Sequence, residues 1–269
     1  MERQEHNPLM HFRTSTHAKH WMFTLDVLEE KQLSLLSPAL FTSLEESILR
    51  YYCEKKLIEC IQLRKYRHKT IAAAITFLKR FFLVNPINAI PLANITAACL
   101  FLAGKTEETQ IHYSKILDIF KISQQDLFAA EVRVLAASNF NVHIWCIYHT
   151  LSGCLKNFTI ESSLESQQLS LLSERAKSIV TESLHSNAMF LLSPGQYALC
   201  ALTLAARELN IPFEQSVQGL PAQSSLETYL TLFQSECEKS SQIISAFQTL
   251  SSHQIDDLLN RQISIISGT

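Results

Sequence analysis

The stretch AACLFLAGKTEE, residues 97–108, joins an apolar segment directly to a charged one. Its first eight residues, Ala97–Gly104, are all small or apolar, which is typical of a helix buried on every side. Lys105 follows at once, so a charge stands where the apolar segment has barely ended. We expect a core helix that opens at Pro91 and extends through Leu102. Lys105 is then either a helix end that faces water or the rim of a site that holds a partner.

The composition favours an all-α protein. Hydrophobic residues make up 47% and charged residues 18% of the 269 residues, so a substantial core can form. Only 5 residues are glycine, well below the usual share of about 7%. Strand-and-turn architectures need glycine for positive φ angles, whereas helices are weakened by it. We therefore predict an all-α fold with room for one large domain or two of ordinary size.

Charge, cysteine usage and hydropathy exclude several classes of protein. The net charge of −2 gives no electrostatic reason to expect nucleic acid as the main partner. The 7 cysteines form no CxxC pair, which favours reduced thiols and argues against a zinc site. No apolar run approaches the roughly 18 residues of a membrane helix, and no signal-peptide pattern opens the chain. We expect no cofactor. We also expect no metal, because polar N-terminal histidines are usually solvated. The histidines in question are His6, His11, His17 and His20.

Helical patterns divide the first half of the chain into five segments. These are residues 43–62, 70–84, 91–102, 113–120 and 123–138. Ser43 and Glu46 read as a capping box at the first of them, and Ser123 reads as the cap of the last. Before these segments we expect no structure up to about residue 18, then a short helix over 25–36 that Pro38 ends.

The second half repeats the plan of the first. Ser193, Pro194 and Gln196 form a capping box in front of another apolar helix. Placing Pro194 on Pro91 gives an offset of 194 − 91 = 103 residues, which indicates a duplicated helical domain rather than a solenoid. Further helices are expected over 163–184, 225–233 and 235–250. We divide the chain into a partly disordered extension with a short helix (1–40), a first repeat (41–142) and a second repeat with a C-terminal tail (143–269).

Glu131 indicates what Lys105 is for. It lies in an apolar helical stripe with Leu127 four residues before it and Leu135 four residues after it. A carboxylate in such a stripe needs a partner, because burying it unpaired is costly. The two groups form either an ordinary internal salt bridge or a site that binds exposed peptide groups of a partner helix. At the offset of 103 residues their positions hold Glu208 and Gln234, which favours a role confined to the first half.

The chain resembles the cyclin family, and four stretches carry the resemblance. ITAACLFLAGKTEE (95–108) looks like the cyclin box, and ITFLKRFFLVN (75–85) resembles its second helix in transcriptional cyclins. KHWMFT (19–24) and NAMFLLSPGQYALCALTLAA (187–206) are similar to the opening and the second repeat of cyclins of the H type. The resemblance implies two tandem five-helix cyclin-box repeats with an N-terminal helical extension.

The resemblance also implies a function. A cyclin binds the catalytic subunit of a cyclin-dependent kinase beside its mobile regulatory helix and orders the active site without adding a catalytic group. The family's kinase-binding lysine and glutamate match Lys105 and Glu131, and the flanking contacts match Leu102, Thr106, Glu108, Leu135 and Phe140. The H type implies the CDK-activating kinase, a third assembly subunit, the general transcription and repair machinery and nuclear residence. No membrane and no direct nucleic-acid contact are expected.

Other interpretations stay open at this point. Cell-cycle cyclins carry a substrate-docking patch on the first helix and a buried aspartate in the second. Here the first helix reads SILRYYCEKKL (47–57) and the second-helix position holds Lys79, so we expect no substrate docking of the cell-cycle type. A cyclin C-like or other transcriptional cyclin is one alternative, and a cyclin-fold transcription scaffold without a kinase is another. The basic cluster at residues 64–69 reads as a solvated loop rather than a DNA-binding surface. An enzyme is not expected, since GxGxxG, GxxxxGK[ST] and HExxH are missing from the sequence.

Overall fold

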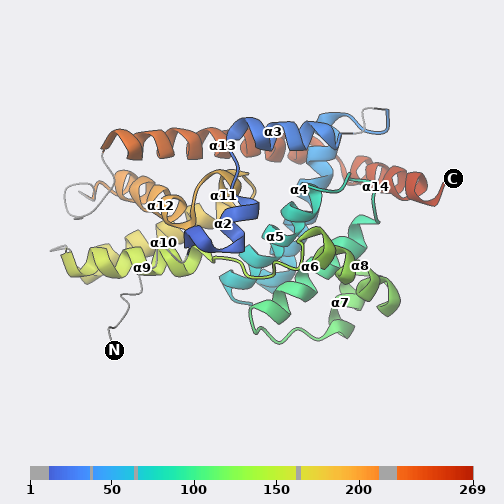
Figure 1. Ribbon diagram of the computed structural model, residues 1–269, viewed down its shortest axis with the longest axis horizontal. Helices are drawn as coiled ribbons and strands as arrows, with labels where there is room; N and C mark the ends of the chain where they lie inside the picture. The colour runs from blue at the N-terminus through green and yellow to red at the C-terminus, as the bar shows by residue number, and fades with distance from the viewer. Residues whose placement is uncertain (1–11, 37–38, 64–65, 162–164, 212–222, 269) are drawn as a thin grey trace.

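The computed structural model describes residues 12–36, 39–63, 66–161, 165–211 and 223–268. Within these ranges every regular element is an α-helix and no strand occurs, as Figure 1 shows. No helix of the described ranges is long and apolar enough to cross a bilayer. His6, His11, Pro38, Arg64 and Lys65, which the sequence analysis singled out, lie outside the described residues.

Five helices form the first half. They are α4 (Ser43–Leu63), α5 (His68–Phe82), α6 (Leu92–Thr106), α7 (Tyr113–Phe120) and α8 (Gln124–Ala137). The apolar helix α6 lies at the centre and contacts the other four. The predicted cap of α8 is confirmed, since the Ser123 hydroxyl accepts a hydrogen bond from the Asp126 amide. The expected end of α6 at Leu102 is wrong, because Gly104 and Lys105 belong to its last turn.

The capping box of α4 lies one residue earlier than predicted. Thr42 Oγ1 accepts from the Glu45 amide at 3.2 Å, and the Glu45 carboxylate accepts from the Thr42 amide at 2.8 Å. Glu46 is instead buried and accepts from the Arg50 guanidinium at 3.3 Å, one turn along the helix. Both pairs of residues fit the capping-box pattern, and the burial of Glu46 decides between them.

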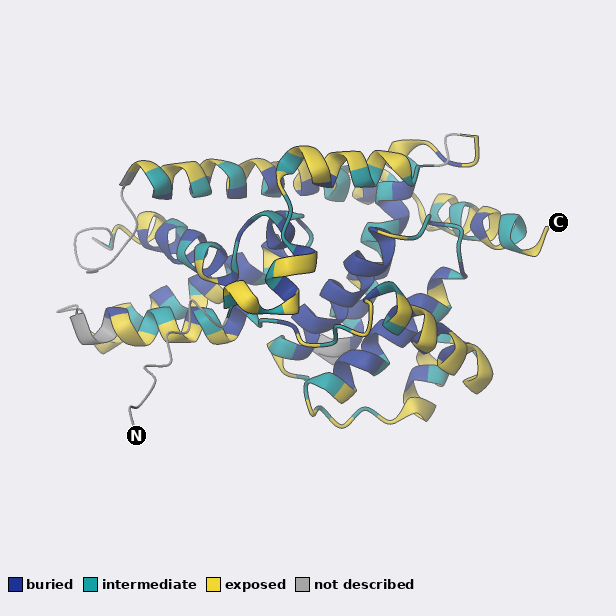
Figure 2. Cartoon of the chain, in the orientation of Figure 1, coloured by how far each residue is buried: buried dark blue, intermediate teal, exposed yellow. Residues whose placement is uncertain are grey.

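Helix α5 joins the two halves. All thirteen residues from Thr70 to Phe82 are buried, so this helix is covered on every side, as the dark blue ribbon of Figure 2 shows. It packs against α4, α6 and α8 of the first half and against α9 of the second. The run Ala72–Ala74 keeps side chains small where these neighbours approach.

The second half is built around a helix that corresponds to α6. Its helices are α9 (Ile147–Glu161), α10 (Ser166–Ser183), the short α11 (Ala188–Leu191), α12 (Pro194–Glu208) and α13 (Gln223–Thr249). Helix α12 has the same length as α6 and contacts the other four. Its predicted capping box of Ser193 and Gln196 is confirmed. The separate helices expected over 225–233 and 235–250 are instead one 27-residue helix, α13.

Helices outside the two halves cover them from both ends of the chain. Helix α2 (Thr16–Trp21) begins where the sequence predicted no structure, because His17 and Trp21 are buried on the core. Helix α3 (Leu25–Ser34) lies along α13, and Lys239 Nζ is 3.3 Å from Glu29 Oε1 (Figure 1). At the other end, α14 (Ser252–Ser267) contacts α4. Its buried Gln262 side chain donates to the carbonyls of Ile87 and Ile90 at 3.0 and 2.9 Å.

Candidate functional site

Gly104 brings the end of α6 close to the segment that follows it. A β-carbon at this position would lie 2.9 Å from Ile111 Cδ1 and 3.1 Å from the Thr109 carbonyl oxygen, both too close. With glycine, the chain turns back against the helix while the next residue reaches the surface. Over three residues, Ala103–Lys105, the sequence therefore passes from the helix core, through a position where only glycine fits against the next segment, to an exposed cation.

Lys105 and Glu131 form an ion pair between α6 and α8. Lys105 Nζ lies 2.7 Å from Glu131 Oε1 and 2.9 Å from Oε2. The lysine side chain is 52% exposed and the glutamate side chain 12%. The ammonium also lies 4.1 Å from the centroid of the Phe101 ring, which adds a cation–π contact. The internal salt bridge is therefore formed, and half of the lysine remains open to a partner.

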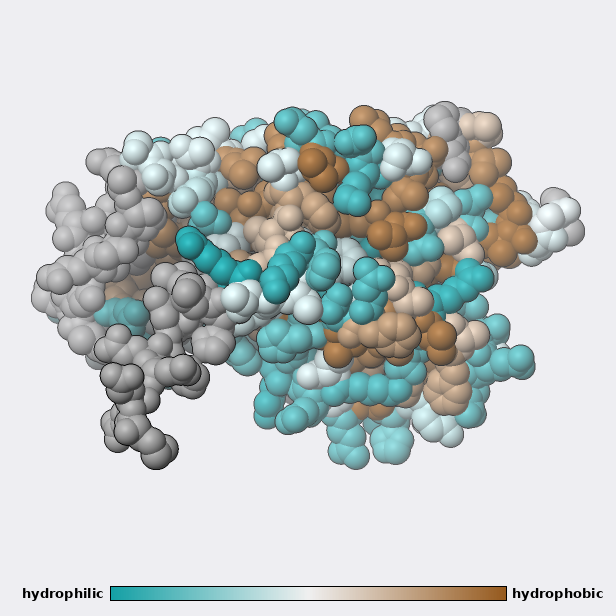
Figure 3. Space-filling model, in the orientation of Figure 1, coloured by the Kyte–Doolittle hydropathy of each residue, from teal (hydrophilic) through white to brown (hydrophobic). Residues whose placement is uncertain are grey.

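Exposed apolar side chains surround this ion pair. Phe128 stacks against Phe101 with ring centroids 6.1 Å apart, and Val132 is 60% exposed one turn further along α8. Phe140, just beyond α8, is 68% exposed. Figure 3 shows hydrophobic side chains gathered among hydrophilic ones in the region of α6 and α8. Exposed aromatic and aliphatic groups around a fixed charge pair are typical of a protein-binding surface.

The seven residues singled out from the sequence occupy different environments around this surface. Lys105 and Glu131 are in contact, and the Phe140 amide donates to the Leu135 carbonyl at 2.8 Å. Leu102 is buried in the core, whereas Glu108 is exposed. Glu108 and Phe140 have positive φ angles of 51° and 55°. The Thr106 hydroxyl donates to the Ala103 carbonyl within the last turn of α6.

Sequence reasoning missed Phe101, Phe128 and Val132, which form much of the apolar surround. Phe128 and Val132 are four residues apart and directly follow Leu127 and Glu131, so α8 carries a second apolar stripe beside the buried one. That second stripe is the signal that could have identified them.

A second charged cluster, also missed, holds the two halves together. Glu54 of α4 accepts from Lys79 Nζ of α5 at 2.8 Å, and its other oxygen lies 2.8 Å from His185 Nδ1. Lys79 also donates to the His185 carbonyl at 2.8 Å. Burial alone would raise the pKa of Glu54, but Lys79 and His185 more than offset that effect and lower it. The lysine that departs from the family pattern is thus the partner of a buried glutamate.

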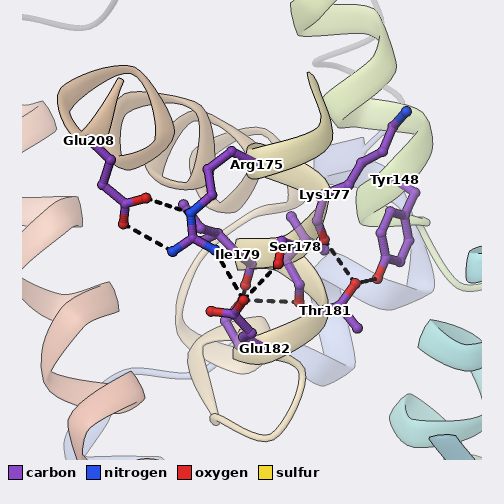
Figure 4. Close-up of polar contacts among 10 residues, drawn as sticks. Tyr148, Arg175, Lys177, Ser178, Ile179, Thr181, Glu182 and Glu208 are labelled. Atoms are coloured by element: carbon purple, nitrogen blue, oxygen red, sulfur yellow. Dashed lines mark hydrogen bonds and ion pairs between the residues drawn. The ribbon is translucent and has the colours of Figure 1, made fainter. Parts of the chain in front are cut away.

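In the second half, the residue at the position of Lys105 belongs to a different ion pair. Glu208 accepts two hydrogen bonds from Arg175 of α10, one of them at 3.1 Å to Oε1 (Figure 4). The hydrogen bonds from Arg175 lower the pKa of Glu208. Gln234, at the position of Glu131, is exposed and belongs to α13. The second half therefore lacks the lysine–glutamate pair of the first.

Metal binding finds no support in the described ranges. They contain no group of three or more histidine, cysteine, aspartate or glutamate side chains that could hold an ion. His17 is buried, and its Nδ1 accepts from the Trp145 amide at 3.3 Å. Burial, Arg80 and His143 lower the pKa of His17 to about 3, so this ring is neutral and packs in the core.

Comparisons with known proteins agree with one another. Residues 24–143 match the model of the cyclin N-terminal domain. A putative cyclin-H of Dictyostelium discoideum is 26% identical over 216 residues, covering 72% of this chain and 76% of that protein. Cyclin-H1-1 of Arabidopsis thaliana is 26% identical over 187 residues, covering 68% and 56%.

Two solved structures show the same fold. A chain of the Chaetomium thermophilum CAK complex bound to ATP-gamma-S superposes with a TM-score of 0.78 at 21% identity, covering 95% of this chain and 90% of that chain. A chain of the yeast TFIIK complex (Kin28/Ccl1/Tfb3) superposes with a TM-score of 0.67 at 21% identity, covering 84% and 99%. At this identity the likeness establishes the architecture.

Proposed function

Because the chain carries a cyclin N-terminal domain and belongs to the cyclin family, we propose that it is the regulatory subunit that binds and activates a cyclin-dependent kinase. The expected all-α cyclin-box architecture is confirmed. The similar curated proteins include cyclin-H of two organisms, which supports a kinase of the CDK-activating, transcription-associated type. We further infer that the chain is non-catalytic and works in the nucleus, together with a third assembly subunit and the transcription and repair machinery.

The observation that carries this proposal is the exposed Lys105–Glu131 pair within its apolar surround. Glu131 holds the lysine in place, and the outward half of Lys105 can donate to carbonyl groups at the end of a kinase helix. Leu102, Thr106, Glu108, Leu135 and Phe140 flank the contact. Phe128, Val132 and Phe140 supply the apolar area that such a contact needs to exclude water.

The proposed mechanism is a change in the kinase rather than chemistry on this chain. Packing of α6 and α8 against the kinase's mobile helix would move that helix inward. Its glutamate would then pair with the lysine that holds ATP, and the activation loop would order. The chain supplies a rigid surface, since α6 is held by four neighbouring helices.

Affinity purification from the native cell tests this proposal. We expect a kinase catalytic subunit to copurify with the wild-type chain and to be depleted with Lys105→Ala/Glu131→Ala. The single variants Lys105→Ala and Glu131→Ala each remove one partner of an interfacial charge pair, which costs about 2–5 kcal/mol, or about 30-fold to several-thousand-fold in affinity. Circular dichroism and the melting temperature of the recombinant variant check that the fold is kept.

Arg175→Ala/Glu208→Ala is the matched control, because it removes a surface ion pair of the second half that includes Glu208, the counterpart of Lys105. It should retain the kinase. Equal retention by both double variants, or no kinase with the wild type, would assign the chain to the scaffold class instead. A cyclin C-like identity would appear as a different kinase in the same experiment.

A further inference from the structure

A groove with a volume of about 530 Å³ lies in the second half, where α10, α12 and α13 meet. Apolar side chains form much of its lining, and one of them comes from α4 of the first half. These residues are Ile58, Ile179, Leu204, Phe233, Cys237 and Ile244. A pocket of this size and character at a junction between repeats is typical of a binding site.

The groove lies at the positions that correspond to the Lys105–Glu131 pair. Glu208 and Gln234, which stand 103 residues further along the chain, both line it. Helix α13 also extends beyond the counterpart of the α8 C-terminus, which is Ser240, as far as Thr249. In that extension Phe247 packs edge-on against Tyr51 of α4 with ring centroids 5.1 Å apart. The second half therefore presents a groove at the place where the first half carries the Lys105–Glu131 pair.

The rim of the groove is acidic and fixed in place. Arg175 donates to Glu208 and also to Glu182 at 3.1 Å, and Glu182 accepts from the Ser178 hydroxyl at 2.7 Å (Figure 4). Glu208 and Glu182 remain 49% and 62% exposed. Two carboxylates thus share one guanidinium, so these three side chains carry a net charge of −1.

The residues behind the rim are also held by hydrogen bonds. The Thr181 hydroxyl donates to the Lys177 carbonyl and lies 2.8 Å from the Tyr148 hydroxyl of α9 (Figure 4). The Ser183 hydroxyl bonds to Tyr197 of α12 at 2.8 Å. A partner would therefore meet a preformed groove and lose little affinity to ordering it.

We propose that this groove binds an amphipathic, basic α-helix of a second protein partner. The apolar face of the helix enters the groove between α10, α12 and α13, while its lysine or arginine side chains meet Glu182 and Glu208. The surface formed by α6 and α8 belongs to the other half (Figure 1), so both can be occupied at once. The inference rests on the groove and goes beyond kinase activation, which requires only the first half's surface.

Fluorescence anisotropy with three labelled synthetic peptides of equal length tests the proposal on the full chain. One peptide is a helix with leucines at i, i+3, i+4 and i+7 flanked by lysines. The second has the same leucines flanked by glutamates, and the third is the first in scrambled order. We expect micromolar binding of the basic helix, weakened by salt, and much weaker binding of the other two. Equal binding of the acidic helix, or no binding of the basic one, overturns the proposal.

Matched variants locate the binding. Ile244→Glu, in the groove, should weaken the basic helix by about tenfold or more, while Ile263→Glu, on exposed α14, should leave it unchanged. Glu182→Gln/Glu208→Gln should lower the affinity and flatten its salt dependence. Equal loss with both isoleucine variants refutes groove binding. If the chain alone forms a dimer that Ile244→Glu dissolves, the occupant is a second copy and the proposal fails. Copurification of the kinase is scored separately, so either proposal can fail alone.

Discussion

Helices α8 and α13 occupy corresponding places in the two halves, and they agree on their inward faces and differ on their outward ones. Inward, Leu127 and Leu230 are both buried, as are Ala130 and Phe233. Outward, the corresponding positions carry apolar residues on α8 and polar residues on α13. The pairs are Phe128 and Thr231, and Val132 and Ser235. The fold requires the inward residues in both halves, whereas it has no need of exposed apolar groups, so those on α8 support the proposed kinase-binding surface.

Ion pairs follow the same division. Glu54–Lys79 is buried within the first half and contacts His185 of the second, whereas Lys105–Glu131 and Arg175–Glu208 lie at the surface of one half each. Buried pairs affect stability strongly when one partner is removed, and exposed pairs hardly at all. The surface pairs are therefore free to differ between the halves.

The largest effect is expected at the buried pair. Lys79→Met leaves Glu54 buried with its main cation gone, which should lower the free energy of unfolding by about 3–5 kcal/mol. Urea denaturation monitored by circular dichroism measures this loss. Glu54→Leu/Lys79→Met removes both charges and should recover much of the stability. A single variant as stable as the wild type would show that the pair does not hold the halves together.

The next largest effect is expected from a variant in which the outward face of α8 resembles that of α13. Phe128→Thr/Val132→Ser removes two exposed apolar groups and should weaken kinase binding by about tenfold or more, because central apolar groups dominate such interfaces. The reciprocal Thr231→Phe/Ser235→Val variant should leave kinase binding unchanged. Surface plasmon resonance with the copurified kinase measures both. Matching losses in the two variants would remove the distinction between the faces.

Acid should reveal how much the buried Glu54 carboxylate contributes to stability. The pKa of Glu54 lies below its ordinary value of 4.5, so the unfolded chain binds more protons and the stabilisation is present above that pH. It is lost as the pH falls below 4.5 through the folded pKa. The wild-type free energy of unfolding should therefore drop more steeply below pH 4.5 than that of Glu54→Leu/Lys79→Met. Parallel urea-midpoint curves for the two proteins would contradict this assignment.

The smallest effect is expected at the surface of the second half. Arg175→Gln breaks the hydrogen bonds to Glu208 and Glu182, but both carboxylates are about half exposed and Arg175 is 35% exposed. The free energy of unfolding should change by less than about 1 kcal/mol, and high salt should reduce the difference further. Thermal unfolding at low and high salt measures it. A loss of unfolding free energy as large as that of Lys79→Met would show that this pair stabilises the fold as strongly as the buried pair does.

Local signals in the sequence predicted much of the fold, whereas contacts between residues far apart in the sequence were harder to predict. The cap at Ser123 and the helix over 113–120 follow from neighbouring residues and are confirmed. The contact between Lys105 and Glu131 followed from a carboxylate in an apolar stripe that needed a cation. The partner of Lys79 gave no such signal, because Glu54 is followed directly by Lys55 and Lys56 and reads as part of a solvated charged run. Ser235 suggested a helix start inside α13, but the helix continues through it and Glu236 is buried there, beside Lys239.

The burial of α5 has a consequence for the order in which the chain is made. Residues Thr70–Phe82 leave the ribosome well before α9, which covers part of their surface in the finished molecule. Until residues 147–161 have been synthesised, the nascent first half exposes an apolar strip that has no cover. Such a strip binds chaperones or aggregates. A stop codon between the halves should therefore yield an insoluble fragment rather than an independently folded first repeat.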